Sequence, residues 1–374
     1  MKFTINRNLL QNNLSVAQKA MASKSNMPAL TGILVNVLED RIVLTTSNID
    51  LAIRVEIKEA DFRIERTGDC LIPGRLFIDI IRKLNGEQVS LELLQDNILR
   101  IQSGSSDITM NLLDVSDYPA QNFELHDKPI VIDADELKEI IKQTTFATSI
   151  VDNKPILTGV NLRIYGNKLL AVSTDSFRLS RRVSTLDDDY LEVNIIVPAK
   201  SLNELAKTIE EDVREVLIYL EKGRILFSFS NIIFQSRMLE GNYPDTTRLI
   251  PTNFPIIVKF NKIELQEAID RVSTMSVNSN ATPIVKLQIN GDGSVVLSSN
   301  SPELGTITDV ISPSEVVSMN EIKISFSASF FLDAIKAFNS SEIFVKITGE
   351  VRPFIFEAED DPGLIELVLP LKGE

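Results

Sequence analysis

The chain has 374 residues, a formal net charge of −14 and a single histidine. This length favours two or three domains. The acidic balance argues against binding nucleic acid by bulk charge, although it allows positive charge confined to one surface. One cysteine, Cys70, excludes an internal disulfide and fits a reducing compartment. Without an apolar leader after Met1 or an apolar run of about 18 residues, we expect a cytoplasmic protein with no membrane span.

Three stretches of the chain open in the same way. Each is an alternating strand that gives way to helical spacing, at residues 2–10, 130–137 and 257–265. Asn6, Asp133 and Asn261 stand where the strand meets the helix, so their side chains are predicted to accept from the free N–H groups of the first turn.

Later landmarks recur at a similar period. A proline enters a predicted strand at Pro28, Pro155 and Pro283. A second helix with apolar residues at i, i+3 and i+4 is predicted at 73–82, 198–207 and 327–336. Each stretch ends on an apolar residue followed by proline, at residues 118–119, 243–244 and 369–370. The chain is therefore interpreted as one domain repeated three times.

A polar segment interrupts two strands in each repeat, at residues 46–51, 173–179 and 299–304. Only the middle copy carries both an aromatic residue and an arginine, Phe177 and Arg178. This difference predicts that a function has been placed on the second repeat.

The fold class expected from this pattern is α+β, with three tandem domains at residues 1–121, 128–246 and 254–374. Polar, proline-bearing linkers are expected at about 120–129 and 245–255. Each domain is predicted to have two helices packed on one side of antiparallel sheet, with roughly eight short strands.

The sequence has few residues that could form a catalytic or metal site. The one histidine, His126, falls in a predicted linker, so a catalytic triad that depends on histidine is almost excluded. One His and one Cys are too few ligands for a usual zinc site. Residues 291–294 are predicted to be a hairpin turn, and the acidic runs 187–189 and 210–212 to be solvated loops. The sequence therefore predicts a non-enzyme with no catalytic residues, metal or cofactor.

The three tandem units, the Thr-Asp-Ser-Phe-Arg-Leu segment at 174–179 and the ending Leu-Pro-Leu-Lys at 369–372 together resemble the bacterial DNA polymerase III beta subunit family, the beta sliding clamps. The resemblance covers the whole chain. It implies a head-to-tail homodimer that closes into a ring, with helices lining a hole that holds double-stranded DNA irrespective of sequence. The partners that it implies are the polymerase III alpha subunit, the clamp loader and other proteins with a clamp-binding motif.

The same resemblance implies one pocket per chain for short peptide motifs. By position, it maps onto Leu157, Thr174, Ser176, Phe177, Arg178, Leu179, Pro244, Arg248, Leu249, Leu367, Val368, Leu369, Pro370, Leu371 and Lys372. The apolar members are expected to form a cleft, and the two arginines to bind polar groups at its edge. Phe177 departs from the His common in the family, and the Lys-Gly-Glu ending departs from the usual tail.

Two further sets follow from the resemblance. The residues expected to face DNA are Arg7, Lys19, Lys24, Arg75, Arg82, Lys83, Lys138, Lys142, Lys200 and Lys207. The dimer contact is expected at Ile108 in the first repeat and at Thr274 and Met275 in the third. Two alternatives stay open at this point: a repeat scaffold that binds peptides without DNA, and an enzyme with an unusual carboxylate site.

Overall fold

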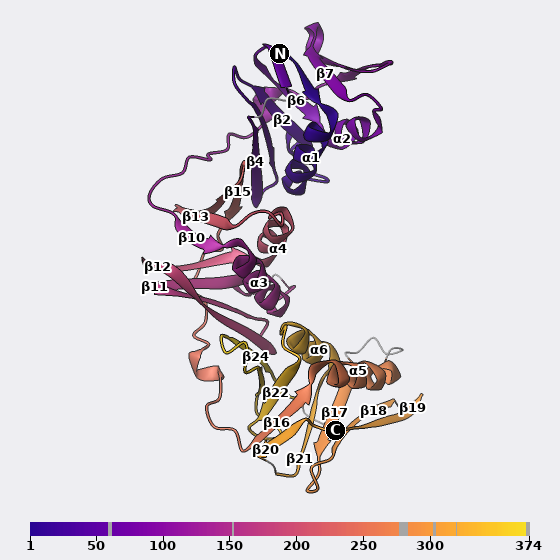
Figure 1. The fold of residues 1–374 in the computed structure, drawn as a ribbon, viewed down its shortest axis with the longest axis vertical. Coiled ribbons are helices and arrows are strands. Elements are labelled where there is room, and N and C mark those ends of the chain that lie inside the picture. The colour runs from indigo at the N-terminus through magenta and orange to yellow at the C-terminus, as the bar shows by residue number, and fades with distance from the viewer. Residues whose placement is uncertain (59–61, 152, 277–282, 302–303, 319, 372–374) are drawn as a thin grey trace. The chain divides into compact units, whose positions relative to one another are not determined.

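The computed structural model describes residues 1–58, 62–151, 153–276, 283–301, 304–318 and 320–371. The chain divides into two compact units, each with its own sheets. Unit 1 comprises residues 1–137 and 201–238, and unit 2 comprises residues 138–200 and 239–374. Figure 1 labels their elements. Each unit is described by itself.

Unit 1 contains two sheets in which all strand pairs are antiparallel. The five-stranded sheet has the order β5-β1-β7-β8-β9 and the eight-stranded sheet the order β10-β13-β14-β15-β4-β3-β2-β6. Their strands are β1 (Lys2–Asn6), β2 (Gly32–Val37), β3 (Ile42–Ser47), β4 (Leu51–Ile57), β5 (Phe62–Arg66), β6 (Gly68–Pro73), β7 (Gln88–Leu93), β8 (Ile98–Ser103), β9 (Ser106–Asn111), β10 (Ile130–Asp133), β13 (Glu215–Glu221), β14 (Arg224–Phe229) and β15 (Ile232–Arg237).

Unit 2 contains a seven-stranded sheet of order β11-β12-β24-β23-β22-β16-β20 and a four-stranded sheet of order β19-β18-β17-β21. These pairs are also antiparallel. The strands are β11 (Gly159–Thr174), β12 (Arg178–Pro198), β16 (Ile256–Asn261), β17 (Ile284–Ile289), β18 (Val295–Ser301), β19 (Gly305–Ile311), β20 (Glu315–Ser318), β21 (Ile322–Ser327), β22 (Glu342–Ile347), β23 (Phe354–Glu357) and β24 (Leu364–Val368).

The first helix of each repeat begins where the sequence predicts it. These helices are α1 (Arg7–Ala17), α3 (Ala134–Thr144) and α5 (Lys262–Ser273). The predicted caps are confirmed, because the Oδ1 atoms of Asn6, Asp133 and Asn261 each accept two main-chain N–H groups of the following turn at 2.9–3.1 Å. The same short side chain therefore starts the same element three times.

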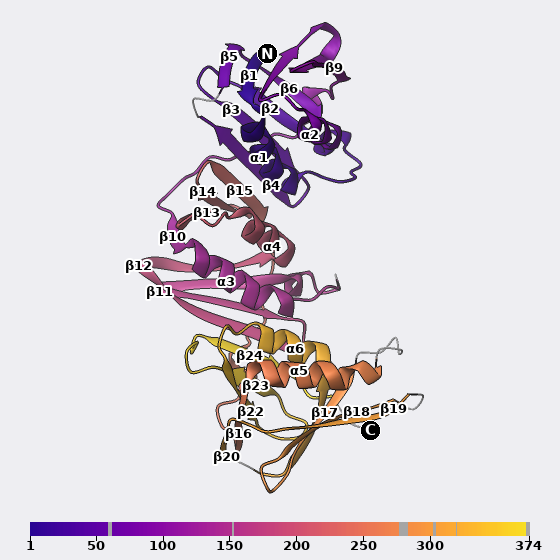
Figure 2. The same ribbon diagram turned by 45° about the vertical axis from the view of Figure 1, so that its right-hand side comes forward.

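The second helices are also confirmed, as α2 (Gly74–Lys83), α4 (Ala199–Thr208) and α6 (Ala328–Lys336). Each helix buries one face: Phe77 and Ile81 in α2, for example, are at most 1% exposed. In the third repeat α5 and α6 lie side by side in both ribbon views (Figure 2). Their buried faces meet the core built by Phe326, Phe331 and Phe354.

Some expectations about the strands are wrong. Pro28 and Pro155 begin 3₁₀ turns, Pro28–Thr31 and Pro155–Thr158, and the strands start at the glycine after each turn. The second repeat does not have many short strands, because β11 and β12 run for 16 and 21 residues. The pairing of β11 with β12 continues past Gly166, which has φ +56°, through register shifts on both sides of this residue. The acidic run 187–189 consequently lies within β12 and is not a loop.

The polar interruptions of repeats one and two are the same turn. Asn48 Oδ1 accepts from the N–H groups of Asp50 and Leu51, and Asp175 Oδ1 accepts from those of Phe177 and Arg178. Both are Asx turns between paired strands. The third interruption includes residues 302–303, which lie outside the described residues.

Strand pairing joins one repeat to the next in each unit. In unit 1, β4 of the first repeat pairs with β15 of the second. In unit 2, β12 of the second repeat pairs with β24 of the third. Each joint therefore couples the strand after the polar turn in one repeat to the last strand of the following repeat. Within the described ranges, no helix is long and apolar enough to cross a membrane.

Candidate functional site

The turn between β11 and β12 is held in place by its own side chains. Asp175 forms the Asx turn, and Thr174 Oγ1 donates to the carbonyl of Arg178 at 2.6 Å while accepting from the N–H of Ser176 at 3.1 Å. Ser176 has φ +81°, a left-handed conformation that a short polar residue tolerates better than a branched one. The turn presents Phe177 outward, with 58% of that residue exposed.

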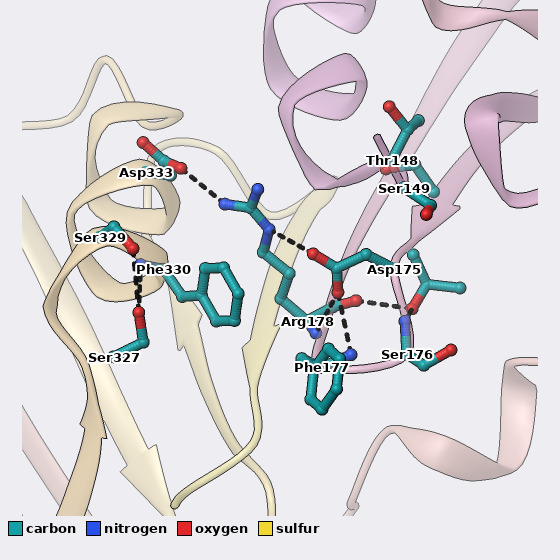
Figure 3. A network of polar contacts seen from close by, with 12 residues as sticks. Thr148, Ser149, Asp175, Ser176, Phe177, Arg178, Ser327, Ser329, Phe330 and Asp333 are labelled. Atoms are coloured by element: carbon teal, nitrogen blue, oxygen red, sulfur yellow. Dashed lines mark hydrogen bonds and ion pairs between the residues drawn. The ribbon is translucent and has the colours of Figure 1, made fainter. Parts of the chain in front are cut away.

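Arg178 links this turn to α6 (Figure 3). Its Nε donates to Asp175 Oδ2 at 3.0 Å and its Nη1 donates to Asp333 Oδ2 at 2.6 Å. The guanidinium carbon lies 4.5 Å from the ring centroid of Phe330. The Arg178 side chain is 13% exposed and binds both carboxylates.

An apolar cluster lies behind the turn. Val172, Leu179, Ile355 and Leu367 are buried together. Half-buried side chains pack around them: Leu170, Tyr243, Ile250, Phe254, Ile365 and Leu369. The predicted pocket residues Leu179 and Leu367 are at most 4% exposed and belong to this cluster. Val368 is fully buried in the larger core of the third repeat.

The C-terminal segment runs beside the turn. Arg178 and Leu179 pair with Val368 and Leu367 in the sheet, and the N–H of Leu369 donates to the carbonyl of Phe177 at 2.9 Å. Leu371 donates to the carbonyl of Ser325 at 2.7 Å, while Pro370 between them is half-buried. Lys372 lies outside the described residues.

The remaining predicted pocket residues come from two other segments. Leu157 is 4% exposed within the 3₁₀ turn that precedes β11. Pro244, Arg248 and Leu249 are exposed on the segment that follows Tyr243, and Leu249 has an exposed fraction of 52%. The structure thus brings the strand after the polar turn, the C-terminal strand and Ile250 of this linker to one apolar cluster. Phe177, in the turn, and Leu249, next to Ile250, are exposed.

Two further groups have roles that no sequence pattern indicates: Tyr243, which packs on the apolar cluster, and Glu366, which lies on the opposite face of β24 from Ile365 and Leu367. The hydroxyl of Tyr243 accepts from the N–H of Thr174 at 3.0 Å, and burial raises the pKa of the phenol. Glu366 is 1% exposed on β24. Burial raises its pKa well above the ordinary value, against the lowering effects of Ser180 and Arg178.

The hydrogen bonds of Ser180 agree with a neutral Glu366. Its Oγ lies 2.6 Å from the carbonyl oxygen of Gln143 and 2.7 Å from Glu366 Oε1. A hydroxyl carries one proton and satisfies only one of two acceptors. Both contacts are hydrogen bonds when the Glu366 carboxyl donates to Ser180 and Ser180 donates to Gln143.

Two of the basic residues expected to face DNA bond to helix ends. Arg7 Nη1 donates to the carbonyl of Leu84, which ends α2, at 2.9 Å. Lys19 Nζ donates to the carbonyl of Lys207, near the end of α4, at 2.6 Å, and burial lowers the pKa of its ammonium group. Both cations therefore stabilise helix C-termini.

The other basic residues divide by their surroundings. Arg82, Lys142 and Lys207 are exposed but pair with Asp79, Glu139 and Glu204 on their own helices. Lys138 is half-buried in α3. The exposed cations that remain are Lys24, Arg75, Lys83 and Lys200.

The residues expected at the dimer contact lie at or beside sheet edges. Ile108 is on β9, which ends the five-stranded sheet. Thr274 and Met275 form a 3₁₀ turn that contacts β19, and β19 ends the four-stranded sheet.

Among the cavities lined by described residues, two in unit 1 lie away from the predicted pocket. One, of about 710 Å³, is lined by α1, the end of β4 and the β14–β15 hairpin. The other, of about 480 Å³, lies between the β2–β3 hairpin and residues 115–123.

Family models match the chain in three consecutive segments. The N-terminal domain of the DNA polymerase III beta subunit matches residues 1–122, the central domain residues 131–245 and the C-terminal domain residues 247–372.

Relatives match over the full length. The beta sliding clamps of Staphylococcus epidermidis and Staphylococcus aureus are 37% and 36% identical, over 100% of this chain and 99% of theirs. The crystal structure of the DNA polymerase sliding clamp from Bacillus subtilis is 35% identical with a TM-score of 0.96, and that of the DNA polymerase III beta chain from Streptococcus pneumoniae is 32% identical with a TM-score of 0.96. Both structural matches cover 100% of each chain.

Proposed function

This chain belongs to the DNA polymerase III beta subunit family, the beta sliding clamps, and on that premise we propose how it closes into a ring, meets DNA and receives its partners. It is a DNA sliding clamp, a processivity factor without an active site of its own, whose partners include DNA and a DNA polymerase. The observation that carries this function is the tandem match of all three family domains along one chain.

Two chains associate head to tail into a ring around duplex DNA in the cytoplasm. The two joints within the chain support this proposal, because each pairs the strand after the polar turn with the last strand of the next repeat. In the third repeat, the strand after the polar segment is β19, which lies at the edge of its sheet. In the first repeat, the last strand is β9, which also lies at a sheet edge. A second copy of the chain satisfies both edges by the same pairing. Ile108, Thr274 and Met275 then lie at the seam.

The ring tethers the polymerase III alpha subunit, the clamp loader and other motif-bearing proteins through the surface around Phe177 and Leu249. Both side chains are exposed, and the segments that carry them contribute Leu179 and Ile250 to the apolar cluster, which suits an extended peptide with a few apolar anchors. Arg248 is the exposed cation at its edge. Leu179 and Leu367 act from below by supporting the cluster.

Topological linkage gives the direct test of the function. The clamp is loaded on nicked circular DNA, which is then cut once. We expect it to stay on the circle and to leave the linear form, because a ring slides off an end. Equal retention on both forms contradicts a ring that encloses DNA, and retention on neither shows that the protein does not enclose DNA at all.

Lys24, Arg75 and Lys83 are proposed to bind DNA phosphates, because they are exposed on the first repeat. Removing one cation that neutralises a phosphate makes the plot of log affinity against log salt shallower by about 0.9. Replacing all three by Ala is expected to flatten this plot. The matched control replaces Arg163, Lys222 and Arg352, which are exposed on strands and turns. Equal slopes for the two variants would show that only net charge matters.

A further inference from the structure

The two joints of the chain share one register. In each joint, three residues on neighbouring strands are paired side by side: two come from one repeat, and the third comes from the last strand of the next repeat. The row in the first joint is Thr45, Arg54 and Ile233, and the row in the second joint is Val172, Arg181 and Ile365. The second row includes Val172 and Ile365 of the apolar surface proposed to bind peptides. The first joint therefore has a position equivalent to that surface.

The linkers that follow these repeats are anchored alike. Tyr118 and Tyr243 each precede a proline, and each hydroxyl bonds to the main chain of a strand beneath it. Tyr118 Oη donates to the carbonyl of Thr45 at 3.4 Å, and Tyr243 Oη accepts from the N–H of Thr174 at 3.0 Å. The segment at residues 115–123 thus covers the first joint as the segment after Tyr243 covers the second.

A cavity of about 480 Å³ occupies this place in the first joint. Apolar side chains contribute to its wall from both sides: Leu34, Leu38 and Val43 from the sheet, and Phe123 from the linker. Leu38 is 37% exposed. This volume lies within the range of about 300–1,000 Å³ that is typical of ligand-binding pockets.

The polar wall of the cavity includes one donor that lacks an acceptor. Arg54 pairs with Glu56 through Nη2, but its Nε–H is buried without a hydrogen-bond partner among the described residues. A buried N–H without an acceptor costs free energy. The guanidinium also contributes its partly exposed positive charge to the cavity wall, where it suits a carboxylate or carbonyl oxygen of a ligand. On the other side, Asn36 donates to Asp69 at 2.9 Å and closes the polar edge.

We propose that this cavity is a second peptide-binding site in each chain, the first-joint counterpart of the surface around Phe177 and Leu249. Its occupant is an extended peptide that places an apolar side chain against Leu34, Leu38 and Val43 and an acidic or carbonyl oxygen against Arg54. The proposal rests on the proposed function, because peptide binding at the cavity is inferred from the equivalence of the first joint to the joint where peptides are proposed to bind.

The test titrates the full chain with a labelled tripeptide, acetyl-Asp-Leu-Phe-amide, which carries both kinds of group. We expect two molecules to bind per chain. Leu249→Arg removes one of them and Leu38→Arg removes the other, each by a decrease of at least about tenfold in affinity. The matched control is Leu191→Arg, because Leu191 is 89% exposed on β12 and belongs to neither site. The control is expected to leave both sites intact.

Methyl NMR of the unmodified chain locates the peptide without relying on a variant that folds. The signals of Leu34, Leu38 and Val43 are expected to shift with the second binding event. If only one peptide binds per chain, if Leu249→Arg abolishes that binding and if these methyl signals do not shift, the second site is overturned and the proposed function is unaffected. One molecule absent only in Leu38→Arg overturns the first site instead. The second site is also overturned if no peptide binds at all. It is overturned as well if Leu38→Arg changes the mass of the assembly but does not change peptide binding.

Discussion

The guanidinium of Arg178 binds carboxylates from two repeats, and its removal leaves both without their cation. We expect Arg178→Ala to lower the free energy of unfolding by about 2–3 kcal/mol, below the range for fully buried pairs because the Asp333 side chain is 41% exposed. The measurement is urea unfolding. The control is Arg163→Ala, whose partner Glu192 is exposed, with an expected decrease of about 0–1 kcal/mol. Equal decreases contradict a special role for Arg178.

Glu366 makes stability depend on pH. Its pKa is raised in the folded chain, so the folded state keeps a proton that the unfolded state releases above about 4.5. The stabilisation is complete below that pH and falls as the pH rises toward the folded-state pKa. Asp333 raises this pKa further and Arg178 lowers it.

Glu366→Gln removes the titration and keeps a donor toward Ser180. We therefore expect the unfolding midpoint of the variant, relative to the unmodified chain, to rise as the pH increases above about 4.5 and to level off above the folded-state pKa. Glu359→Gln, at an exposed carboxylate, serves as the control. A difference that stays constant with pH contradicts a neutral Glu366.

For single residues, the sequence shows which side chain is present but not which partner it contacts. Arg7 and Lys19 belong to a basic, acid-free stretch, yet each bonds to the carbonyl of a helix end. Arg178 meets Asp333 across 155 residues of sequence. Such partners depend on tertiary packing, which no local spacing reveals.

At the scale of single elements, the three repeated caps give a clean comparison. Asn6 and Asn261 each accept two N–H groups at the start of α1 and α5. Asn6→Ala and Asn261→Ala are each expected to lower the free energy of unfolding by about 1 kcal/mol, because two donors lose their acceptor. Denaturant titration measures this decrease. Asn12→Ala, at an exposed site within α1, is expected to change the free energy much less.

The helices could be predicted because their caps and apolar faces recur three times in register. The long β11–β12 hairpin could not. Its continuation past Gly166 depends on a bulge, and glycine at that position predicts a turn equally well. The pairing of β4 with β15 also lay beyond local patterns, since alternation marks a strand but not its neighbour.

At the scale of the whole molecule, the open edges of β9 and β19 predict the assembly. We expect a solution mass of twice the chain's 41.7 kDa. Val310 is 64% exposed on β19, and Val310→Asp is expected to shift the mass toward one chain, because a charge at a paired strand must be desolvated. Light scattering after size exclusion measures this. Val351→Asp, at an exposed turn, is the control. Dissociation by both variants, or by neither, contradicts a seam at β19.

Pairing between strands also explains how such a chain can diverge. The joints β4–β15 and β12–β24 are made of amides and carbonyls that every residue except proline supplies. Mutational drift can replace the side chains along a joint without removing its hydrogen bonds. A lineage can therefore change charge and partner preference along a joint while its main-chain hydrogen bonds persist, whereas proline removes a donor from the joint itself.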